Sequence, residues 1–256
     1  MSETLEIEFL GTGTSTGVPS IGCHCEVCSS TDARDNRLRC SSIVRYKGKN
    51  ILIDCGPDFR QQILRATDFR LDALLLTHIH YDHVAGIDDL RPYSFQHSFP
   101  IYARKEVNRQ LRVSMPYCFS DTLYKGVPIL DLIDIADQKF VVADSVEVQP
   151  IPVMHDKLLI NGYRIGPLAY ITDCSYIAPD QIERLKGVPL LVINALRMKP
   201  HHSHMSLEES LDVVRQIGPK KAYLIHMCHD IGLHAVTDSQ LPENVHLAYD
   251  GLVVRI

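Results

Sequence analysis

Alternating apolar and polar positions predict several strands along the chain. Leu5–Leu10 places glutamates between Leu, Ile and Phe, the pattern of a strand with one face in the core. Ser42–Tyr46 and Asn50–Asp54 flank the sequence KGK, which predicts a β-hairpin. Further strands are predicted at Asp72–Thr77, Val146–Met154, Tyr163–Thr172, Leu190–Asn194, Ala222–His226 and Val245–Tyr249, and Leu252–Ile256 closes the chain.

Helices are indicated by start and stop residues around amphipathic segments. Pro57–Ala66 begins with a proline, and Pro179–Gly187 ends at a glycine. Ser206–Ile217 begins with a capping-box sequence, S-x-x-E, and Glu106–Phe119 is a fourth candidate. Strand pairs dominate the first half, and strands alternate with helices in the second. We therefore expect an α/β fold of two packed sheets with helices outside, in a single domain over residues 1–256.

The composition is that of a globular protein and excludes several classes. Hydrophobic residues make up 45% of the 256 residues and charged residues 22%, which is wrong for a disordered chain. The net charge of −5 disfavours binding to nucleic-acid backbones or anionic lipid. No run approaches the roughly 18 apolar residues of a membrane helix, and the first residues lack the basic and apolar parts of a signal peptide. We expect a cytoplasmic protein with no membrane contact.

The chain is rich in metal ligands, with 13 histidines and 8 cysteines but no tryptophan. Thiols stay reduced in the cytoplasm, so a cysteine cluster there indicates metal or redox chemistry rather than disulfides. Metal binding is therefore the first chemistry to test against the motifs.

The segment THIHYDH at residues 77–83 carries the strongest chemical signal. It follows a predicted buried strand directly, and its three imidazoles and one carboxylate would repel one another or stay unpaired without a cation. His78 and His80 lie two apart, so an extended segment points both to the same side. Asp82 and His83 follow a turn of the chain and can face a second ion. The alternative, a solvated polar loop, explains this crowding of ligands poorly.

Three more candidate ligands stand at predicted strand ends, because four ligands cannot saturate two ions. His155, Asp173 and His226 each follow a strand, where a loop can aim a side chain at a site. Each alone is more often structural than functional. Together they complete the ligands of two metals, with Asp173 placed to bridge them.

A second cluster lies in the long loop after the first strand and consists of Cys23, Cys25 and Cys28. This C-x-C-x-x-C spacing lets three thiolates wrap one tetrahedral ion, which needs a fourth ligand. His229, three residues beyond His226, is the best candidate, although His24 could replace one of the ligands. Thiol exchange is the alternative role of the cluster. We favour a structural zinc, because a loop over about residues 20–40 with few large apolar side chains would be poorly ordered without one.

These motifs resemble those of the metallo-β-lactamase superfamily, whose signature is HxHxDH followed by His, Asp and His. The resemblance implies an αββα four-layer sandwich. The ligands that it implies are His78, His80 and His155 for one metal, Asp82, His83 and His226 for the other, and Asp173 as the bridge. Asp54, in the sequence LIDCG, matches the first motif of the superfamily and would orient a ligand imidazole.

A bridging carboxylate narrows the chemistry, because it holds two cations about 3.5–4 Å apart, as in two-metal phosphoesterases. A hydroxide shared between the cations has a lowered pKa and attacks phosphorus in line, while the cations neutralise charge on phosphorus and on the leaving oxygen. Oxygen and imidazole ligands suit manganese, zinc or iron, and availability often decides among them. The expected activity is hydrolysis of a phosphodiester with two divalent metals as cofactors.

Within the superfamily the chain is similar to the PhnP group of phosphoribosyl cyclic phosphodiesterases. That group shares the cysteine cluster, the opening GTG-x-x-x-GVP loop (Gly11–Pro19), the H-x-x-H pattern at residues 226–229 and a late Asp250-Gly251. The resemblance covers nearly the whole chain. It implies a small substrate, cyclic or of sugar-phosphate type, and suggests a homodimer.

Three histidines of one loop compete for the role of general acid: His201, His202 and His204. The alternative is a solvated, histidine-rich loop. The resemblance picks His204, which would protonate the leaving alkoxide or hold the phosphate. The expected catalytic residues are therefore His204, Asp82 and Asp54. Asn194 departs from the group, which often has an acidic residue there.

Other functions use the same motifs. A transfer-RNA 3′-processing nuclease shares the ligands but reaches RNA with a flexible arm; the sequence shows no Gly-rich basic insertion, and the net charge disfavours RNA. A hydrolase of the same fold that acts on a non-phosphate ester or thioester is a further alternative. A non-catalytic zinc-binding module is disfavoured, because a structural site needs only four ligands.

Overall fold

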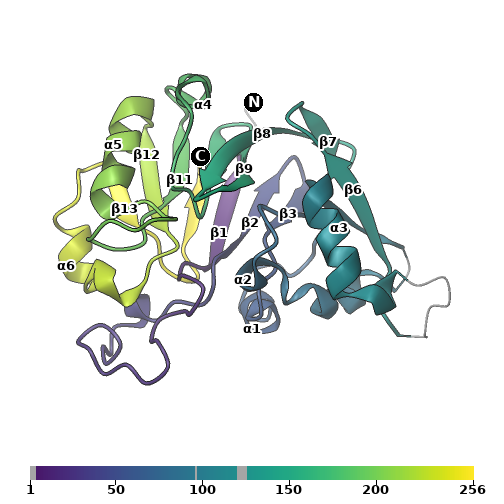
Figure 1. Cartoon of the computed structure of the whole chain (residues 1–256), viewed down its shortest axis with the longest axis horizontal. Coiled ribbons are helices and arrows are strands. Elements are labelled where there is room, and N and C mark those ends of the chain that lie inside the picture. Colours follow the sequence, from purple (N-terminus) through teal and green to yellow (C-terminus); the bar gives the residue numbers. More distant parts are fainter. Residues whose placement is uncertain (1–3, 96, 120–125) are drawn as a thin grey trace.

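The computed structural model describes residues 4–95, 97–119 and 126–256. Two β-sheets pack face to face, and helices cover the outer face of each sheet (Figure 1). The αββα four-layer sandwich expected from the sequence is confirmed.

The first sheet has the strand order β14-β1-β2-β3-β4-β5-β6. Its strands are β1 (Glu6–Gly11), β2 (Ser41–Tyr46), β3 (Lys49–Ile53), β4 (Ala73–Leu75), β5 (Phe99–Arg104), β6 (Leu130–Ile135) and β14 (Val253–Arg255). β2 and β3 form the predicted hairpin, and β3, β4, β5 and β6 run parallel. The carboxyl ends of β3 and β4 therefore lie at one edge, where Asp54 and the segment 78–83 leave the sheet.

The second sheet has the strand order β13-β12-β11-β10-β9-β8-β7. Its strands are β7 (Phe140–Val142), β8 (Val146–His155), β9 (Leu158–Ile165), β10 (Leu168–Ile171), β11 (Leu190–Asn194), β12 (Lys221–Ile225) and β13 (Val245–Leu247). β9 runs antiparallel to both β8 and β10, and β10, β11 and β12 run parallel. β8, β10 and β12 therefore point the same way and end at the same edge.

The helices are α1 (Phe59–Ile63), α2 (Tyr81–Val84), α3 (Lys105–Ser114), α4 (Pro179–Leu185), α5 (Leu207–Ile217) and α6 (His234–Asp238). Apolar side chains of α1, α2 and α3 pack on the outer face of the first sheet, and those of α4 and α5 pack on the second. None of the helices in the described ranges is long and apolar enough to cross a bilayer.

The main core lies between the two sheets. Phe9 of the first sheet and Tyr163 and Tyr170 of the second are fully buried there, within one cluster that draws on both sheets. Each large apolar side chain buried in this way contributes about 1.5–3 kcal/mol. This packing fixes the two sheets relative to each other and so aligns the strand ends that carry the candidate ligands.

One predicted strand is wrong. The segment Tyr163–Thr172 is divided between β9 and β10, which pair antiparallel with each other. Gly166 has a φ of +50°, a left-handed conformation that glycine adopts at little cost, and it turns the chain back. The Gly166-Pro167 pair is a turn signal in the sequence, and the strand prediction did not use it.

Two predicted helices are shorter than expected. Pro57–Ala66 contains only α1, and Glu106–Phe119 contains α3 followed by a 3₁₀ helix, Pro116–Cys118. Pro116 has no N–H to donate, so the α-helix ends before it. The capping box at Ser206 and Glu209 is confirmed, with both reciprocal hydrogen bonds present.

Candidate metal centre

The seven candidate ligands of the catalytic metals lie at strand ends and come from both sheets. The first sheet contributes four from the segment 78–83, which leaves β4 and forms α2. The second contributes His155 at the end of β8, Asp173 after β10 and His226 after β12. His80 is exposed and the other six are buried, so the cluster is accessible from its His80 side. We call these seven residues the His/Asp centre.

The ligand atoms of the His/Asp centre fall into two groups, each within 4.8 Å: His78, His80 and His155, and Asp82, His83, Asp173 and His226. Asp173 lies between the groups. One of its carboxylate oxygens is 3.3 Å from His83 Nε2, and the other is 3.1 Å from His226 Nε2 and 3.8 Å from His78 Nε2. A carboxylate in this position can bind one cation on each side.

Three non-glycine residues at this edge of the sandwich have strained backbones. Asp54, Asp173 and His226 all have left-handed backbones, with φ of 60°, 54° and 58°. Such a conformation costs of order 1–3 kcal/mol for a residue other than glycine and persists where the surrounding fold enforces it. Asp54 and His226 immediately follow a strand, and Asp173 follows one after Thr172. The unusual turn directs each side chain toward the centre.

Hydrogen bonds fix the imidazoles from behind. His83 Nδ1 donates to Asp54 Oδ2 at 2.7 Å, and Asp54 also accepts from the backbone N–H and hydroxyl of Thr77. Because the Thr77 hydroxyl donates to Asp54, its oxygen accepts from His78 Nδ1 at 3.0 Å. His155 Nδ1 donates to the carbonyl of Ser203 at 2.7 Å. Protonation at Nδ1 leaves the Nε2 lone pair of each ring available to a metal.

Cations fit this donor set. Nε2 of His78, His83 and His226 is buried and has no hydrogen-bond partner among the described residues, although carboxylate oxygens lie close by. Buried polar atoms are rarely left in this state. Lone pairs and carboxylate oxygens that converge without hydrogen-bond alignment suit divalent metals with nitrogen and oxygen ligands.

Three buried carboxylates give the centre a strong attraction for positive charge. Burial lowers the pKa of His83, but the neighbouring carboxylates, with Asp173 the strongest, hold it well above its usual value. The same balance raises the pKa of His226 to about 9. Burial raises the pKa of Asp54, whereas facing imidazoles outweigh burial and lower the pKa of Asp82 and Asp173. Divalent cations would neutralise this concentration of negative charge.

Of the three histidines in the 201–204 loop, His204 lies against the His/Asp centre. Its Nε2 is 3.3 Å from Asp173 Oδ2, and its ring stacks on that of His226 with centroids 4.9 Å apart. Burial lowers the pKa of His204 to about 4 despite the contact with Asp173. His201 lies behind it, with Nδ1 atoms 3.4 Å apart, and the exposed His202 packs on His201.

Asn194 holds the backbone that carries Asp173. Its side-chain oxygen accepts from the N–H of Cys174 at 2.7 Å, and its amide donates to the carbonyl of Cys174 at 3.0 Å. An acidic residue could make only the first of these bonds. Sequence reasoning missed this role, as it missed Thr77 and Thr172, which directly precede ligands and hydrogen-bond to Asp54 and Asp173.

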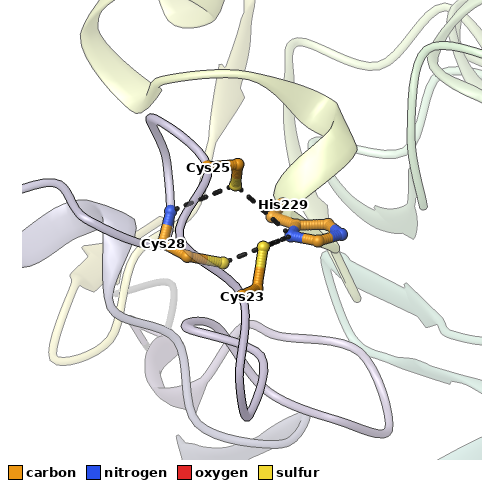
Figure 2. Close-up of side chains that lie close together, drawn as sticks. All are labelled: Cys23, Cys25, Cys28 and His229. Atoms are coloured by element: carbon orange, nitrogen blue, oxygen red, sulfur yellow. Dashed lines mark hydrogen bonds between the residues drawn. The ribbon is translucent and has the colours of Figure 1, made fainter.

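A second group of donors lies in the loop after β1 and on the 3₁₀ helix His229–Ile231 (Figure 2). We call these residues the cysteine clip: Cys23, Cys25, Cys28 and His229. The sulfur atoms of Cys23, Cys25 and Cys28 lie 3.2, 3.5 and 3.2 Å from His229 Nδ1. Tetrahedral zinc with Zn–S of about 2.3 Å and Zn–N of about 2.05 Å requires S···N distances of about 3.6 Å. The four donors fit a closed zinc site, and His24 is exposed and outside the group.

The sulfur atoms of the clip differ in their surroundings. A hydrogen bond from the N–H of Cys28 lowers the pKa of the Cys25 thiol to about 7, whereas burial raises that of Cys28 to about 11. Zinc binds thiolates, so a bound ion would have to displace the Cys28 proton at neutral pH.

Backbone hydrogen bonds connect the clip to the His/Asp centre. Met227 lies between His226 and His229 in sequence; its N–H donates to the carbonyl of Thr12, and its carbonyl accepts from the N–H of Thr14. Asp250 accepts from both the N–H and the hydroxyl of Thr12. The opening loop thus supports the end of β12, which carries a residue of each site.

Comparison with known proteins places these motifs in a family. The model of the beta-lactamase superfamily domain matches residues 49–227. A solved structure described as a new diphosphatase from the PhnP family is 39% identical and superposes with a TM-score of 0.92, covering 99% of this chain and 97% of that one. Zn²⁺-bound PqqB from Methylobacterium extorquens shares the fold, with 20% identity, a TM-score of 0.77 and coverage of 97% and 99%.

Two curated relatives carry other names. An octanoyltransferase of Porphyromonas gingivalis is 47% identical over 247 residues, which are 95% of this chain but only 50% of the relative. This chain therefore spans about half the length of that protein. A ribonuclease Z of Methanopyrus kandleri is 25% identical over 305 aligned positions that cover 100% of this chain and 99% of the relative. Family model and structural match together establish that the chain belongs to the beta-lactamase superfamily and, within it, to the PhnP family of metallo-β-lactamase-fold hydrolases.

Proposed function

We propose that the protein is a two-metal hydrolase of a small phosphodiester. The observation that carries this proposal is the position of Asp173, whose carboxylate contacts imidazoles of both ligand groups. The diphosphatase named for the PhnP-family structure is also an enzyme that attacks phosphorus, which supports the same class of reaction. A small substrate is favoured over RNA because the chain has a net charge of −5.

Residues of the His/Asp centre and their hydrogen-bond partners would have different roles in such a reaction. The His/Asp centre would hold two divalent cations, of manganese, zinc or iron, which when bound lower the pKa of water and neutralise charge on phosphorus. Asp54 and Thr77 keep His83 and His78 in the orientation that exposes Nε2. Asp82 faces His83 and His226 in the second ligand group.

His204 is placed to act on the leaving group. When the hydroxyl of Ser203 donates to His204 Nδ1, 2.9 Å away, the proton of the neutral ring lies on Nε2, toward Asp173. From there the ring can donate to the leaving oxygen or hold a phosphate oxygen. A bound anionic phosphate would raise the pKa of this imidazole, so that a larger fraction of it carries the proton needed to act as a general acid.

The test is hydrolysis of bis(p-nitrophenyl) phosphate by protein loaded with manganese or zinc, with metal content measured on the same samples. We expect release of p-nitrophenol with at least one metal. No turnover with either metal, although both sites are loaded, would contradict the proposal. A disubstituted diphosphate such as ADP-ribose, assayed in parallel, separates cleavage of a diester from cleavage of a phosphoanhydride.

A second candidate is hydrolysis of a carboxylic ester or thioester. It is favoured by one observation, the 47% identity to half of a protein named octanoyltransferase. p-Nitrophenyl octanoate and an octanoyl thioester are the discriminating substrates. Hydrolysis of the octanoyl ester or thioester, without hydrolysis of the phosphodiester, would show that the metal centre acts on acyl groups instead of phosphodiesters.

A further inference from the structure

An apolar surface borders the ligand segment and has no role in the proposed chemistry. His78 and His80 face the cluster, with ring centroids 4.5 Å apart. The residues between and after them, Ile79 and Tyr81, instead line cavities against α3. Alternation along the extended segment thus gives it a metal side and an apolar side.

Two adjoining cavities make up this surface. One has a volume of about 380 Å³ and runs between His78, α3 and the start of β9. The other, of about 570 Å³, shares Ile79 and Gln110 with the first and continues along α3 to Val113. We call the combined surface the α3 groove. Its apolar lining is Ile79, Tyr81, Val84, Val107, Val113, Leu158 and Leu159.

The groove exposes apolar side chains to solvent side by side. Val113 is 78% exposed, Tyr81 75% and Leu159 46%. Apolar side chains gathered along one groove favour a binding site over scattered surface hydrophobic residues. Three charged residues also line the cavities: Arg104, Glu106 and Arg109. Arg104 is paired with Asp137, 2.8 Å away, and the formal charges of Glu106 and Arg109 offset each other, so the lining has no excess positive charge to select an anionic ligand.

The groove begins at the His/Asp centre. His78 itself lines the first cavity, and Leu158 is paired with His155 across the β8–β9 turn. A chain attached to a reacting group at the metals can therefore extend past His78 and Leu158 into the groove.

We propose that the α3 groove binds a saturated hydrocarbon group of the substrate, an alkyl or acyl chain. This inference rests on the proposed function, because it requires the reacting group to lie at the His/Asp centre. Six of the seven apolar side chains that line the groove, all except Tyr81, are aliphatic, so they match a hydrocarbon chain. Sugar hydroxyls placed against these aliphatic side chains would lack hydrogen bonds there, which is unfavourable.

Binding of n-alkylphosphonates tests the inference without any turnover. Methyl-, butyl- and octylphosphonate are titrated into metal-loaded protein by isothermal calorimetry, with phenylphosphonate as an aromatic comparison. We expect Kd to fall about two- to fourfold for each added methylene until the groove is filled. Equal Kd values along the series, or phenylphosphonate binding more tightly than octylphosphonate, would overturn the inference.

Two surface variants locate the effect. Leu159→Gln and Val113→Gln lie in the groove, and Val141→Gln is the control, because Val141 is 55% exposed on β7 and lines neither cavity. The groove variants should flatten the dependence of Kd on chain length, and the control should keep it. A dependence that survives both groove variants would also refute the site. If Kd falls steeply from methyl- to octylphosphonate but the protein does not hydrolyse bis(p-nitrophenyl) phosphate, the proposed function is refuted and the binding of a hydrocarbon chain in the groove is not.

Discussion

The His/Asp centre and the cysteine clip meet at the end of β12, where His226 and His229 are three residues apart, yet they are built on opposite principles. The clip draws three of its four donors from one irregular loop, and the four donors close a tetrahedron. The His/Asp centre takes its donors from the ends of rigid strands and leaves one side accessible at His80. Closed coordination suits a structural ion, whereas an accessible side is what a reacting group requires.

The difference also shows in how the donors are supported. Imidazoles of the His/Asp centre are held by buried side chains such as Asp54 and Thr77. Sulfur atoms of the clip accept from backbone N–H groups of their own loop, as Cys25 does from Cys28 and Cys28 from Ser20. The geometry of the His/Asp centre therefore depends on the fold. In the cysteine clip, a bound ion would impose the geometry on the loop. The predictions below, from the largest expected effect on hydrolysis to the smallest, test this division.

Asp173→Asn should have the largest effect. It removes the carboxylate that contacts both ligand groups, so we expect hydrolysis to fall about a thousandfold and the content of catalytic metal to fall with it. Zinc in the clip should be retained. Asp212→Asn, an exposed change on α5, is the control. Metal analysis and steady-state kinetics decide; loss of clip zinc as well would show that the two sites are not independent.

His204→Ala should lower kcat about a hundredfold while both sites keep their metal. The reason is that His204 contacts Asp173 from outside the two main ligand groups, although its ring nitrogen also lies within 4.8 Å of ligand atoms of His155 and Asp173. Loss of a catalytic metal in this variant would instead make His204 a ligand. His202→Ala, at the exposed end of the same loop, is the control and should change kcat little.

Asn194→Asp should lower hydrolysis about tenfold, the effect typical of a residue that positions a ligand. The aspartate loses the bond to the Cys174 carbonyl and places negative charge against it, which displaces Asp173. KM should change less than kcat, and affinity for the catalytic metals should fall. Asn244→Asp makes the same chemical change at a bond to Pro219 and should leave both unaffected.

Cys23→Ser should remove about one zinc per chain and lower the midpoint of thermal unfolding, with a smaller loss of hydrolysis than the three changes above. The activity lost should come through the shared end of β12. His24→Ala is the matched control in the same loop and should keep the zinc. Retention of zinc by Cys23→Ser would refute the clip as drawn in Figure 2.

The smallest effect concerns pH and Asp250, beneath the loop that joins the two sites. Burial raises the pKa of Asp250 to about 6. Its contribution to stability is therefore fully present below the unfolded pKa near 4 and is lost as pH rises through 6. Between pH 5 and 7.5 the free energy of unfolding should fall by about 1 kcal/mol relative to the Asp250→Asn variant. Parallel pH profiles of the two proteins would contradict this.

The strand-end positions of the candidate ligands were predictable from the sequence, and packing against distant elements was not. His155, Asp173 and His226 each follow a run of apolar residues long enough to reveal a strand. The choice of His204 over His201 depends on where the 201–204 loop folds back, which no local pattern specifies. Asn194 likewise acts through Cys174, 20 residues away in sequence.

Parts of the fold were missed for two different reasons. The turn between β9 and β10 carries the pair Gly166-Pro167, a turn signal that was present but not used. β6 has the sequence LDLIDI, in which Asp131 and Asp134 lie three residues apart, so the alternation that identifies a half-buried strand is broken. The α3 groove depends on α3 lying beside the ligand segment, which is a tertiary contact.

Both sites join chain segments from opposite halves of the sandwich. The segment 78–83 belongs to the first sheet and faces His155, Asp173 and His226 of the second, and the clip loop leaves β1 to reach His229 beyond β12. Ions bound there would act as cross-links over the seam between the sheets and would stabilise the docked state by RT ln(1 + [M]/Kd) for each site. Chelation should therefore loosen the docking of the two sheets before it affects the strands within either one, and amide protons in the seam should be the first to exchange.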